Sequence, residues 1–220
     1  MLLYDGNAPG PNPVTVRHFI LERGGLHLEV ERIDLAHLAN READYVENVN
    51  SRGELPALRL DNGHVITEIT AICAYLDEIA DGPSLFGATP EERAVTNMWT
   101  RRAYLEICSP VVTWYRGTDH AKGYYKGYRL HAAETQGWMR AQAERGMERF
   151  NTDLSDGRPF LCGDRFSMAD VLLNGFFGAM QPLAPWIDRP DLKHLARWRS
   201  AMLERPSSTA MMNPLPARVG

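Results

Sequence analysis

Asn12 is the polar side chain with the clearest chemical potential near the start of the sequence. It stands in the segment APGPNPVTVR at residues 8–17, between the apolar run MLLYD and a run with a helical pattern, VTVRHFILE. Asparagine is among the best residues for capping the start of a helix, and proline suits the helical position that follows. The side-chain amide also carries an oxygen acceptor and two N–H donors. Asn12 is therefore predicted to cap a helix and is a candidate donor to a ligand.

A second segment, LPALRLDNGHVITE at residues 55–68, is able to present backbone groups to a ligand. Its two alternating runs meet at Asn62-Gly63, which is the strongest short-range signal for a β-hairpin. A proline ends normal strand pairing, so the N–H and C=O groups of Leu55 before it can pair with an extended, peptide-like ligand. The unpaired N–H groups of a helix that starts near Glu68 favour an anion. These features predict a site for an extended anionic molecule.

Metal, nucleic-acid and membrane sites are not indicated. The seven histidines have no ligand spacing, and the three cysteines lie far apart, as expected for buried free thiols in a reducing compartment. The formal net charge of −4 and the scattered basic residues argue against a nucleic-acid partner. The first ten residues lack the basic and apolar regions of a secretory signal, and no run of residues is long and apolar enough to span a membrane. A cytoplasmic location is expected.

The elements that must position these residues fall into two groups. Residues 1–80 are predicted to alternate between strands and helices. In order, they contain a strand-like MLLYD, a helix from 13 to about 23, a strand LHLEVERIDL, a short helix READYVENV, the hairpin and a helix ITAICAYLDEIA. The order β-α-β-α-β-β-α, with Leu-Pro before the third strand, predicts a thioredoxin-like domain.

The remainder of the chain has an almost entirely helical pattern. After a linker at residues 81–89, a first long helix begins at 90 and is predicted to bend at Pro110. Further helices are predicted over residues 130–154, from residue 168 onwards, and over residues 192–205. The one that begins at 168 is preceded by the cap Ser167, with Asp170 three residues later. The last ten residues read as irregular. The fold class is thus α/β plus all-α, with an all-helical domain at residues 90–220.

Three motifs in the expected order resemble the glutathione S-transferase family. They are NSRGELPALRLDNGHVITEITAICAYLDE in the first domain, the opening PNP before a VR helix as in one bacterial branch, and FLCGDRFSMADVLL in the second domain. The resemblance covers about residues 1–206. It implies a glutathione co-substrate, detoxification chemistry and a homodimer in which the α/β domain of one chain meets the helical domain of the other.

The resemblance also implies roles for individual residues. Leu55 is expected to pair with the glutathione backbone, Pro56 is expected to be cis, and the helix start at Glu68 is expected to hold a ligand carboxylate. Family members use Tyr, Ser, Cys or Asn in the turn after the first strand to activate the thiol, and the PNP match assigns this position to Asn12. The turn has no cysteine. Tyr4 is a rival hydroxyl within the strand, and Arg17 is interpreted as a solvated or interdomain charge.

Two residues depart from the family pattern. Ile69 replaces the usual serine, so its backbone N–H is kept and a hydroxyl bond to the ligand carboxylate, worth about 1.5–3 kcal/mol, is lost. Ile69 also falls on the apolar stripe of its helix, which equally explains it as a core residue, and Thr67 or Thr70 could partly substitute. Glu54 places an acid near the glycine end of the ligand, where it repels a carboxylate unless it points to solvent.

The helical domain is expected to hold the second substrate. Tyr104, Cys108, Val112 and Tyr115 recur along one helix and could line an apolar pocket, although such stripes are more often core. The leading hypothesis is a glutathione-dependent transferase acting on a small, mostly apolar electrophile by conjugation, ether cleavage, or disulfide or peroxide reduction. The alternatives are a glutathione-binding or regulatory protein with weak or no catalysis, and a structural module without a thiol ligand.

Overall fold

A mixed sheet organises the first part of the chain in the computed structural model, which describes residues 1–127 and 130–220. The sheet has the strand order β4-β3-β1-β2-β5, with β1 and β2 parallel and the other pairs antiparallel. The strands are β1 (Leu2–Gly6), β2 (Leu28–Ile33), β3 (Ala57–Arg59), β4 (Val65–Thr67) and β5 (Arg218–Val219). The hairpin at Asn62-Gly63 is confirmed, since β3 pairs with β4 and Gly63 has a φ of 85° that favours glycine.

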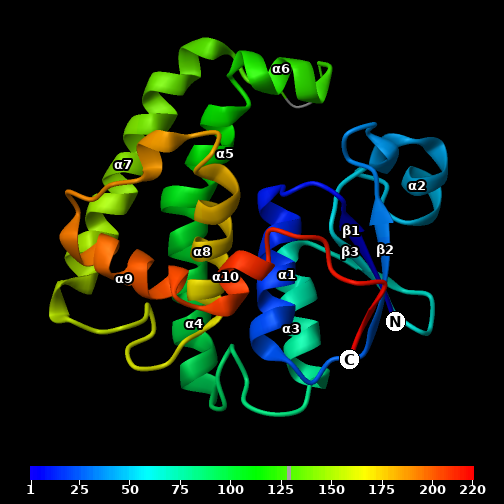
Figure 1. Ribbon diagram of the computed structural model, residues 1–220, viewed down its shortest axis with the longest axis horizontal. Coiled ribbons are helices and arrows are strands. Elements are labelled where there is room, and N and C mark those ends of the chain that lie inside the picture. Colours follow the sequence, from blue (N-terminus) through cyan, green and yellow to red (C-terminus); the bar gives the residue numbers. More distant parts are fainter. Residues whose placement is uncertain (128–129) are drawn as a thin grey trace.

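Helices cover both faces of this sheet. α1 (Pro11–Arg23) and α3 (Ile69–Ile79) lie between the sheet and the helical domain, whereas α2 (Ala43–Asn48) lies on the opposite side after a short 3₁₀ turn at Ala39–Arg41 (Figure 1). This arrangement confirms the predicted thioredoxin-like order. Tyr4 belongs to the α2 side, where its ring makes an edge contact with Tyr45 and carries the Arg59 guanidinium above it.

The last residues of the chain return to this sheet, which the sequence did not predict. They cross from the helical domain to the sheet edge and form β5 against β2 (Figure 1). The Val30 N–H donates to the Ala217 carbonyl at 2.9 Å, and Arg32 donates to the Leu215 carbonyl. Most of the tail is irregular, as expected, and only this strand was missed, because two residues of strand are too few to give a period-2 signal.

The second part of the chain is helical, as predicted. One long helical stretch consists of α4 (Pro90–Ala103), a π-helical turn (Tyr104–Cys108) and α5 (Ser109–Tyr115). The irregularity therefore lies before Pro110 and is a π turn. The remaining elements are α6 (Asp119–Tyr125), which was not expected, α7 (Gln136–Asp153), α8 (Met168–Met180), α9 (Lys193–Leu203), α10 (Pro206–Ala210) and 3₁₀ turns at Ala133–Thr135, Leu154–Asp156 and Pro185–Ile187.

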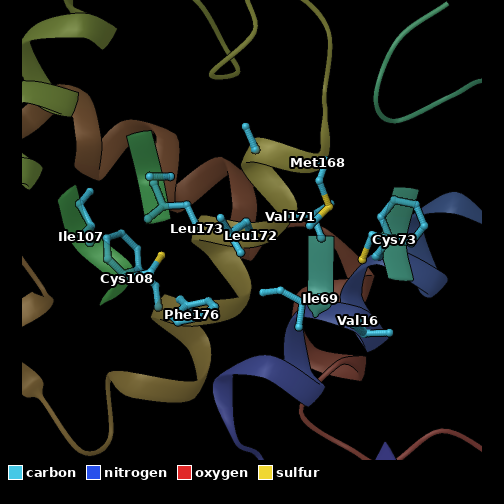
Figure 2. Close-up of a cluster of buried hydrophobic side chains, with 14 of the residues drawn as sticks. Val16, Ile69, Cys73, Ile107, Cys108, Met168, Val171, Leu172, Leu173 and Phe176 are labelled. Atoms are coloured by element: carbon cyan, nitrogen blue, oxygen red, sulfur yellow. The ribbon is translucent and has the colours of Figure 1, made fainter. Parts of the chain in front are cut away.

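α8 packs against both parts of the molecule. It starts with the predicted capping box, in which Asp170 accepts hydrogen bonds from the N–H and hydroxyl of Ser167. Its side chains meet those of α1 and α3 in one continuous apolar cluster, where Val16 and Ile69 face Met168 and Val171 (Figure 2). The orientation of α1 is therefore set by packing against the helical domain as well as against the sheet.

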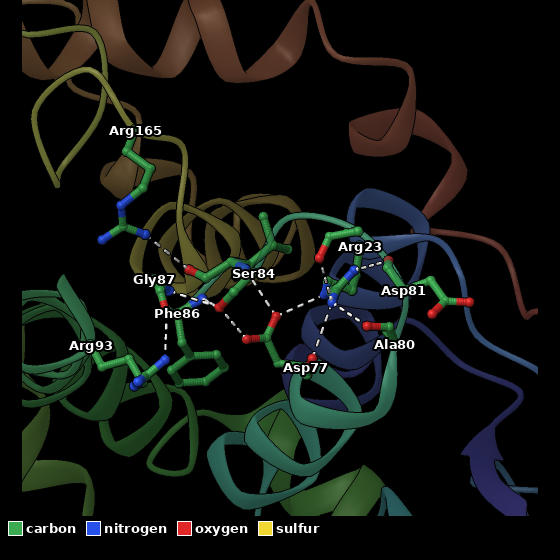
Figure 3. A network of polar contacts seen from close by, with 11 residues as sticks. Arg23, Asp77, Ala80, Asp81, Ser84, Phe86, Gly87, Arg93 and Arg165 are labelled. Atoms are coloured by element: carbon green, nitrogen blue, oxygen red, sulfur yellow. Dashed lines mark hydrogen bonds and ion pairs between the residues drawn. The ribbon is translucent and has the colours of Figure 1, made fainter. Parts of the chain in front are cut away.

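A buried ion pair fixes the connection between the two parts. The Nε of Arg23, at the end of α1, donates to Asp77 of α3 at 2.8 Å, and its other nitrogens donate to carbonyls that include those of Ala80 and Asp81 (Figure 3). Asp77 also accepts the Leu85 N–H at 2.9 Å and the Ser84 hydroxyl. These contacts hold the linker in one path from α3 to α4.

Candidate active site

The turn after β1 presents Asn12 at the second position of α1. The helix begins at Pro11 with Gly10 as its cap, so the expectation that Asn12 caps the helix was wrong. Pro13 is buried, whereas Asn12 is exposed and its amide has no hydrogen-bond partner among the residues that the structure describes. Because proline has no N–H, Asn12 carries the only backbone N–H of the first three helical residues, as well as two amide donors. The donors of this helix start are concentrated on one residue.

Polar contacts beneath the turn hold it in place. Asn7 donates to Asp34 at 3.0 Å and accepts the Leu35 N–H at 2.9 Å. The Nε of Arg17 donates to Asp5 at 2.8 Å, and both side chains are fully buried. Arg17 is therefore neither a solvated nor an interdomain charge, and it stabilises the path from β1 into α1.

The Leu55-Pro56 segment presents its backbone as expected. The peptide bond is cis, and within residues 1–127 and 130–220 neither the N–H nor the C=O of Leu55 forms a hydrogen bond. Tyr45 and the buried Asn50 both donate to the Glu54 carbonyl, at 2.8 and 3.0 Å. These contacts fix the loop so that the unpaired groups of Leu55 are available to a ligand strand.

The start of α3 supplies free N–H groups. Glu68 precedes the helix with a φ of 71°, which is unusual for a residue other than glycine, and no side chain caps the helix. The Ile69 side chain is 8% exposed and packs in the apolar cluster (Figure 2). Thr67 and Thr70 supply hydroxyl groups on either side of it. Position 69 thus combines a core side chain with a helix N-terminus that favours an anion.

These predicted residues are brought together in one cleft of about 560 Å³. One wall comes from the first domain and the other from α4 and the π turn. The predicted members of its lining are Asn12, Glu54, Leu55, Pro56, Glu68, Ile69, Thr67, Thr70 and Tyr104. The sequence did not reveal Asn50, Asn97, Thr100 and Arg101, which complete the lining.

A second cleft, of about 180 Å³, adjoins the first between the turn after β1 and the helical domain. Asn12, Glu54, Leu55 and Tyr104 line both clefts. Asn12 is thus at the edge shared by the larger cleft and a smaller one whose lining includes apolar, aromatic, hydroxyl and charged side chains. This position suits a group that acts on one ligand at the point where it meets a second ligand.

Two residues of the predicted stripe line the second cleft, and the other two are buried. Tyr104 and Val112 line the second cleft, but Cys108 is 1% exposed in the core, where burial raises the pKa of its thiol well above the usual range. Tyr115 is also buried, which raises its pKa to about 12, and its hydroxyl is 2.8 Å from His120 Nδ1.

The π turn explains which residues were missed. A π turn adds one residue to a helical turn and rotates everything after it. Beyond Tyr104–Cys108 the cleft is therefore faced by Ser109, Val112, Thr113 and Arg116. Leu35, Leu38, Asn40 and Arg41 form the opposite wall, and Tyr124, Tyr125 and Phe176 complete the lining.

The arrangement is able to bind and orient a ligand. Among residues 1–127 and 130–220 no group of His, Cys, Asp or Glu side chains is placed to hold a metal ion. No helix in that part of the chain is both long and apolar enough to cross a membrane. The site offers hydrogen-bond donors, helix N-termini and unpaired backbone groups, which suit an extended anionic ligand with a nucleophilic group near Asn12.

The chain matches two family models and a curated relative over most of its length. Residues 13–79 match the family model described as the N-terminal domain of glutathione S-transferase, and residues 134–206 match the one for its C-terminal domain. Glutathione S-transferase 2 of Saccharomyces cerevisiae is 33% identical over 213 residues, which cover 94% of this chain and 87% of the relative.

Solved structures show the same fold. The crystal structure of Gtt2 from Saccharomyces cerevisiae matches with a TM-score of 0.84 and 31% identity, covering 96% of this chain and all of the other. A glutathione S-transferase of Methylobacillus flagellatus, solved with glutathione bound, matches with a TM-score of 0.78 and 21% identity over 97% and 99% of the two chains. The chain described here therefore belongs to the glutathione S-transferase family.

Proposed function

We propose that this protein uses glutathione as co-substrate and activates its thiol with Asn12 for attack on a small electrophile. The observation that carries this proposal is the position of Asn12 on the edge shared by the two clefts. In conjugation, the thiolate sulfur forms a bond to an electrophilic carbon and the leaving group departs with the electrons of the broken bond. Ether cleavage follows the same course, with an alkoxide or phenoxide as leaving group.

The larger cleft fits an extended tripeptide with charged ends. The unpaired N–H and C=O of Leu55 would pair with the central cysteine of glutathione, as in strand addition. The free N–H groups of Ile69 and Thr70 would bind the γ-glutamyl carboxylate, with the Thr70 hydroxyl as a further donor. The Glu68 carboxylate would attract the ammonium group beside it. This pose directs the thiol towards Asn12.

Asn12 would lower the pKa of the bound thiol without acting as a base. A free thiol has a pKa of about 8.5 and is mostly protonated at neutral pH. The Asn12 amide and its backbone N–H donate to the sulfur more strongly when it is charged, and the positive end of the α1 dipole adds to this preference. The two prolines beside it leave no competing donors.

We also propose a homodimer, as the family resemblance implies. An apolar face of the long helical stretch is unusually exposed: Val95 is 36% exposed, Met98 40% and Leu105 50%. A second copy of the chain would bury this face. Size-exclusion chromatography with light scattering measures the molar mass in solution, which should be that of two chains.

The experiment on Asn12 combines ligand binding with thiol ionisation. Glutathione at millimolar concentration should raise the midpoint of thermal unfolding of the wild type. Asn12→Ala should retain most of this shift, raise the pKa of the bound thiol in a thiolate-absorbance titration, and lower kcat/KM for an aryl halide by about 10- to 100-fold. Asn12→Asp, which replaces a donor with a negative charge, should raise the thiol pKa further.

A matched control is available in Asn213, an exposed residue outside both clefts. Asn213→Ala should match the wild type in every assay. A thermal shift without turnover of an aryl halide, a disulfide or a peroxide would favour a binding protein instead. Equal thiol pKa values in the wild type and Asn12→Ala would remove Asn12 from the mechanism.

A further inference from the structure

Arg116 is a cation in the second cleft whose guanidinium has no partner among the residues that the structure describes. It follows the last residue of α5 and continues the face formed by Ser109, Val112 and Thr113. Its Nε is shielded from solvent without a hydrogen bond, and within the described parts of the chain its guanidinium forms no ion pair or hydrogen bond. The Nε–H group has lost its hydration without gaining a hydrogen bond from these residues, whereas the terminal nitrogens are not shielded and can reach a ligand.

Arg17, Arg41 and Arg158 also have one shielded nitrogen without a hydrogen bond, but each of their guanidinium groups has another partner. Arg17, Arg23 and Arg205 each donate to a carboxylate, at Asp5, Asp77 and Glu22 respectively. Arg41, the other arginine of the second cleft, donates to the Tyr125 carbonyl at 3.1 Å and lies over the Tyr125 ring. Among these arginines, Arg116 alone has no partner within residues 1–127 and 130–220, so its guanidinium is available to a ligand.

We propose that Arg116 makes the second cleft selective for electrophiles that carry a carboxylate remote from the reacting carbon. This inference rests on the proposed function, since it assigns the second substrate of that same site. A guanidinium offers a planar fork of N–H donors that matches the two oxygens of a carboxylate. The negative charge of the substrate would supply the counter-ion that residues 1–127 and 130–220 do not provide.

The layout of the cleft gives this substrate a direction. Tyr104 lines both clefts and so marks the end nearest glutathione, whereas Arg116 lies at the other end of the same helical stretch. Ser109 and Arg116 are separated by about 10 Å along a helix that rises ~1.5 Å per residue. This length suits an aromatic or short aliphatic carboxylate whose apolar body contacts Val112, Leu38 and Phe176.

The test uses two glutathione conjugates that differ in one group. S-(carboxybenzyl)glutathione carries the charge, and S-(carbamoylbenzyl)glutathione is its neutral counterpart of the same shape. Calorimetric titration of the wild type should show tighter binding of the carboxylate by about 10-fold or more. Arg116→Met should abolish this preference, Arg116→Lys should retain part of it, and neither should change the affinity for glutathione itself.

The control variant changes an arginine that lines neither cleft. Arg145→Met removes an exposed arginine of α7 outside both clefts and should keep the wild-type preference. If glutathione binds but the wild type shows no preference, or if Arg116→Met keeps it, the inference about Arg116 is wrong while the proposed function stands. If neither glutathione nor the conjugates bind, the proposed function itself fails and this inference fails with it.

Discussion

Gly175 of α8 lies directly against Thr15 of α1, and a Cβ atom at position 175 would stand 2.8 Å from Thr15 Oγ1 and 3.0 Å from its Cα. The Thr15 hydroxyl donates to the Pro11 carbonyl at 2.8 Å, one residue before Asn12. The helical domain therefore contacts the part of α1 that carries the candidate catalytic residue. This contact couples the packing of the two domains to the position of Asn12.

Gly175→Ala should accordingly damage both stability and activity. The added methyl group meets backbone as well as side chain, so α1 must move, and overpacking of this kind costs about 1–3 kcal/mol of unfolding free energy. We expect a lower midpoint in urea denaturation and a lower kcat/KM at unchanged glutathione concentration. Gly123→Ala, at a helical glycine with open space around it, should leave stability equal or raised by up to about 1 kcal/mol. Equal effects of the two substitutions would contradict the coupling.

Ile69→Ser should separate the two roles of position 69. Loss of the buried side chain should lower the unfolding free energy by about 2–4 kcal/mol, as for other large-to-small changes in a core. The new hydroxyl lies at the start of α3 and should tighten glutathione binding several-fold. Calorimetry on the folded variant measures the second effect apart from the first. Unchanged affinity would show that the free N–H groups and Thr70 already satisfy the carboxylate.

The overall order of elements was predictable because its signals are local. The Asn62-Gly63 turn and the capping box at Ser167 each depend on residues within a few positions of one another. The sequence also located the Leu55-Pro56 segment and the start of α3, since both are marked by local chemistry. In the structure these residues line one cleft.

The errors came from features that no local pattern carries. Prolines at both 11 and 13 allow α1 to begin at either position, and its first turn starts at Pro11, so Asn12 is not the cap. The π turn gives no signal in hydrophobic periodicity, yet it moves Cys108 and Tyr115 out of the pocket and brings Arg116 into it. The sequence alone does not distinguish Arg17 from a surface charge, because only the folded chain brings Asp5 next to it.

Asp170→Asn should strongly destabilise the protein. One carboxylate oxygen accepts the Leu161 N–H and Trp198 Nε1, each at 2.9 Å, and the other accepts the Ser167 N–H at 3.0 Å. The asparagine side chain keeps one oxygen as acceptor, but its NH₂ group then faces the Ser167 N–H. Two donors then face each other and that hydrogen bond is lost. The expected loss is about 2–4 kcal/mol, measured by urea denaturation. Asp191→Asn, at an exposed ion pair with Arg189, should cost less than about 1 kcal/mol. A smaller loss at position 170 than at 191 would contradict this assignment.

Glu22 should make stability depend on pH in the acidic range. Burial acts to raise its pKa, but hydrogen bonds from Arg205 and Ser207, together with the His18 ring 3.7 Å away, outweigh this and hold the pKa far below the ordinary value of 4.5. A lowered pKa in the folded state means that the unfolded chain binds the proton first as pH falls. The contribution of Glu22 is therefore complete above about pH 5 and is lost progressively below it. Glu22→Gln should be less stable than the wild type at neutral pH, and the difference between their unfolding midpoints should shrink on acidification. A difference that stays constant from about pH 7 to about pH 3 would show that the Glu22–Arg205 contact between α1 and α10 contributes no charge-dependent stability.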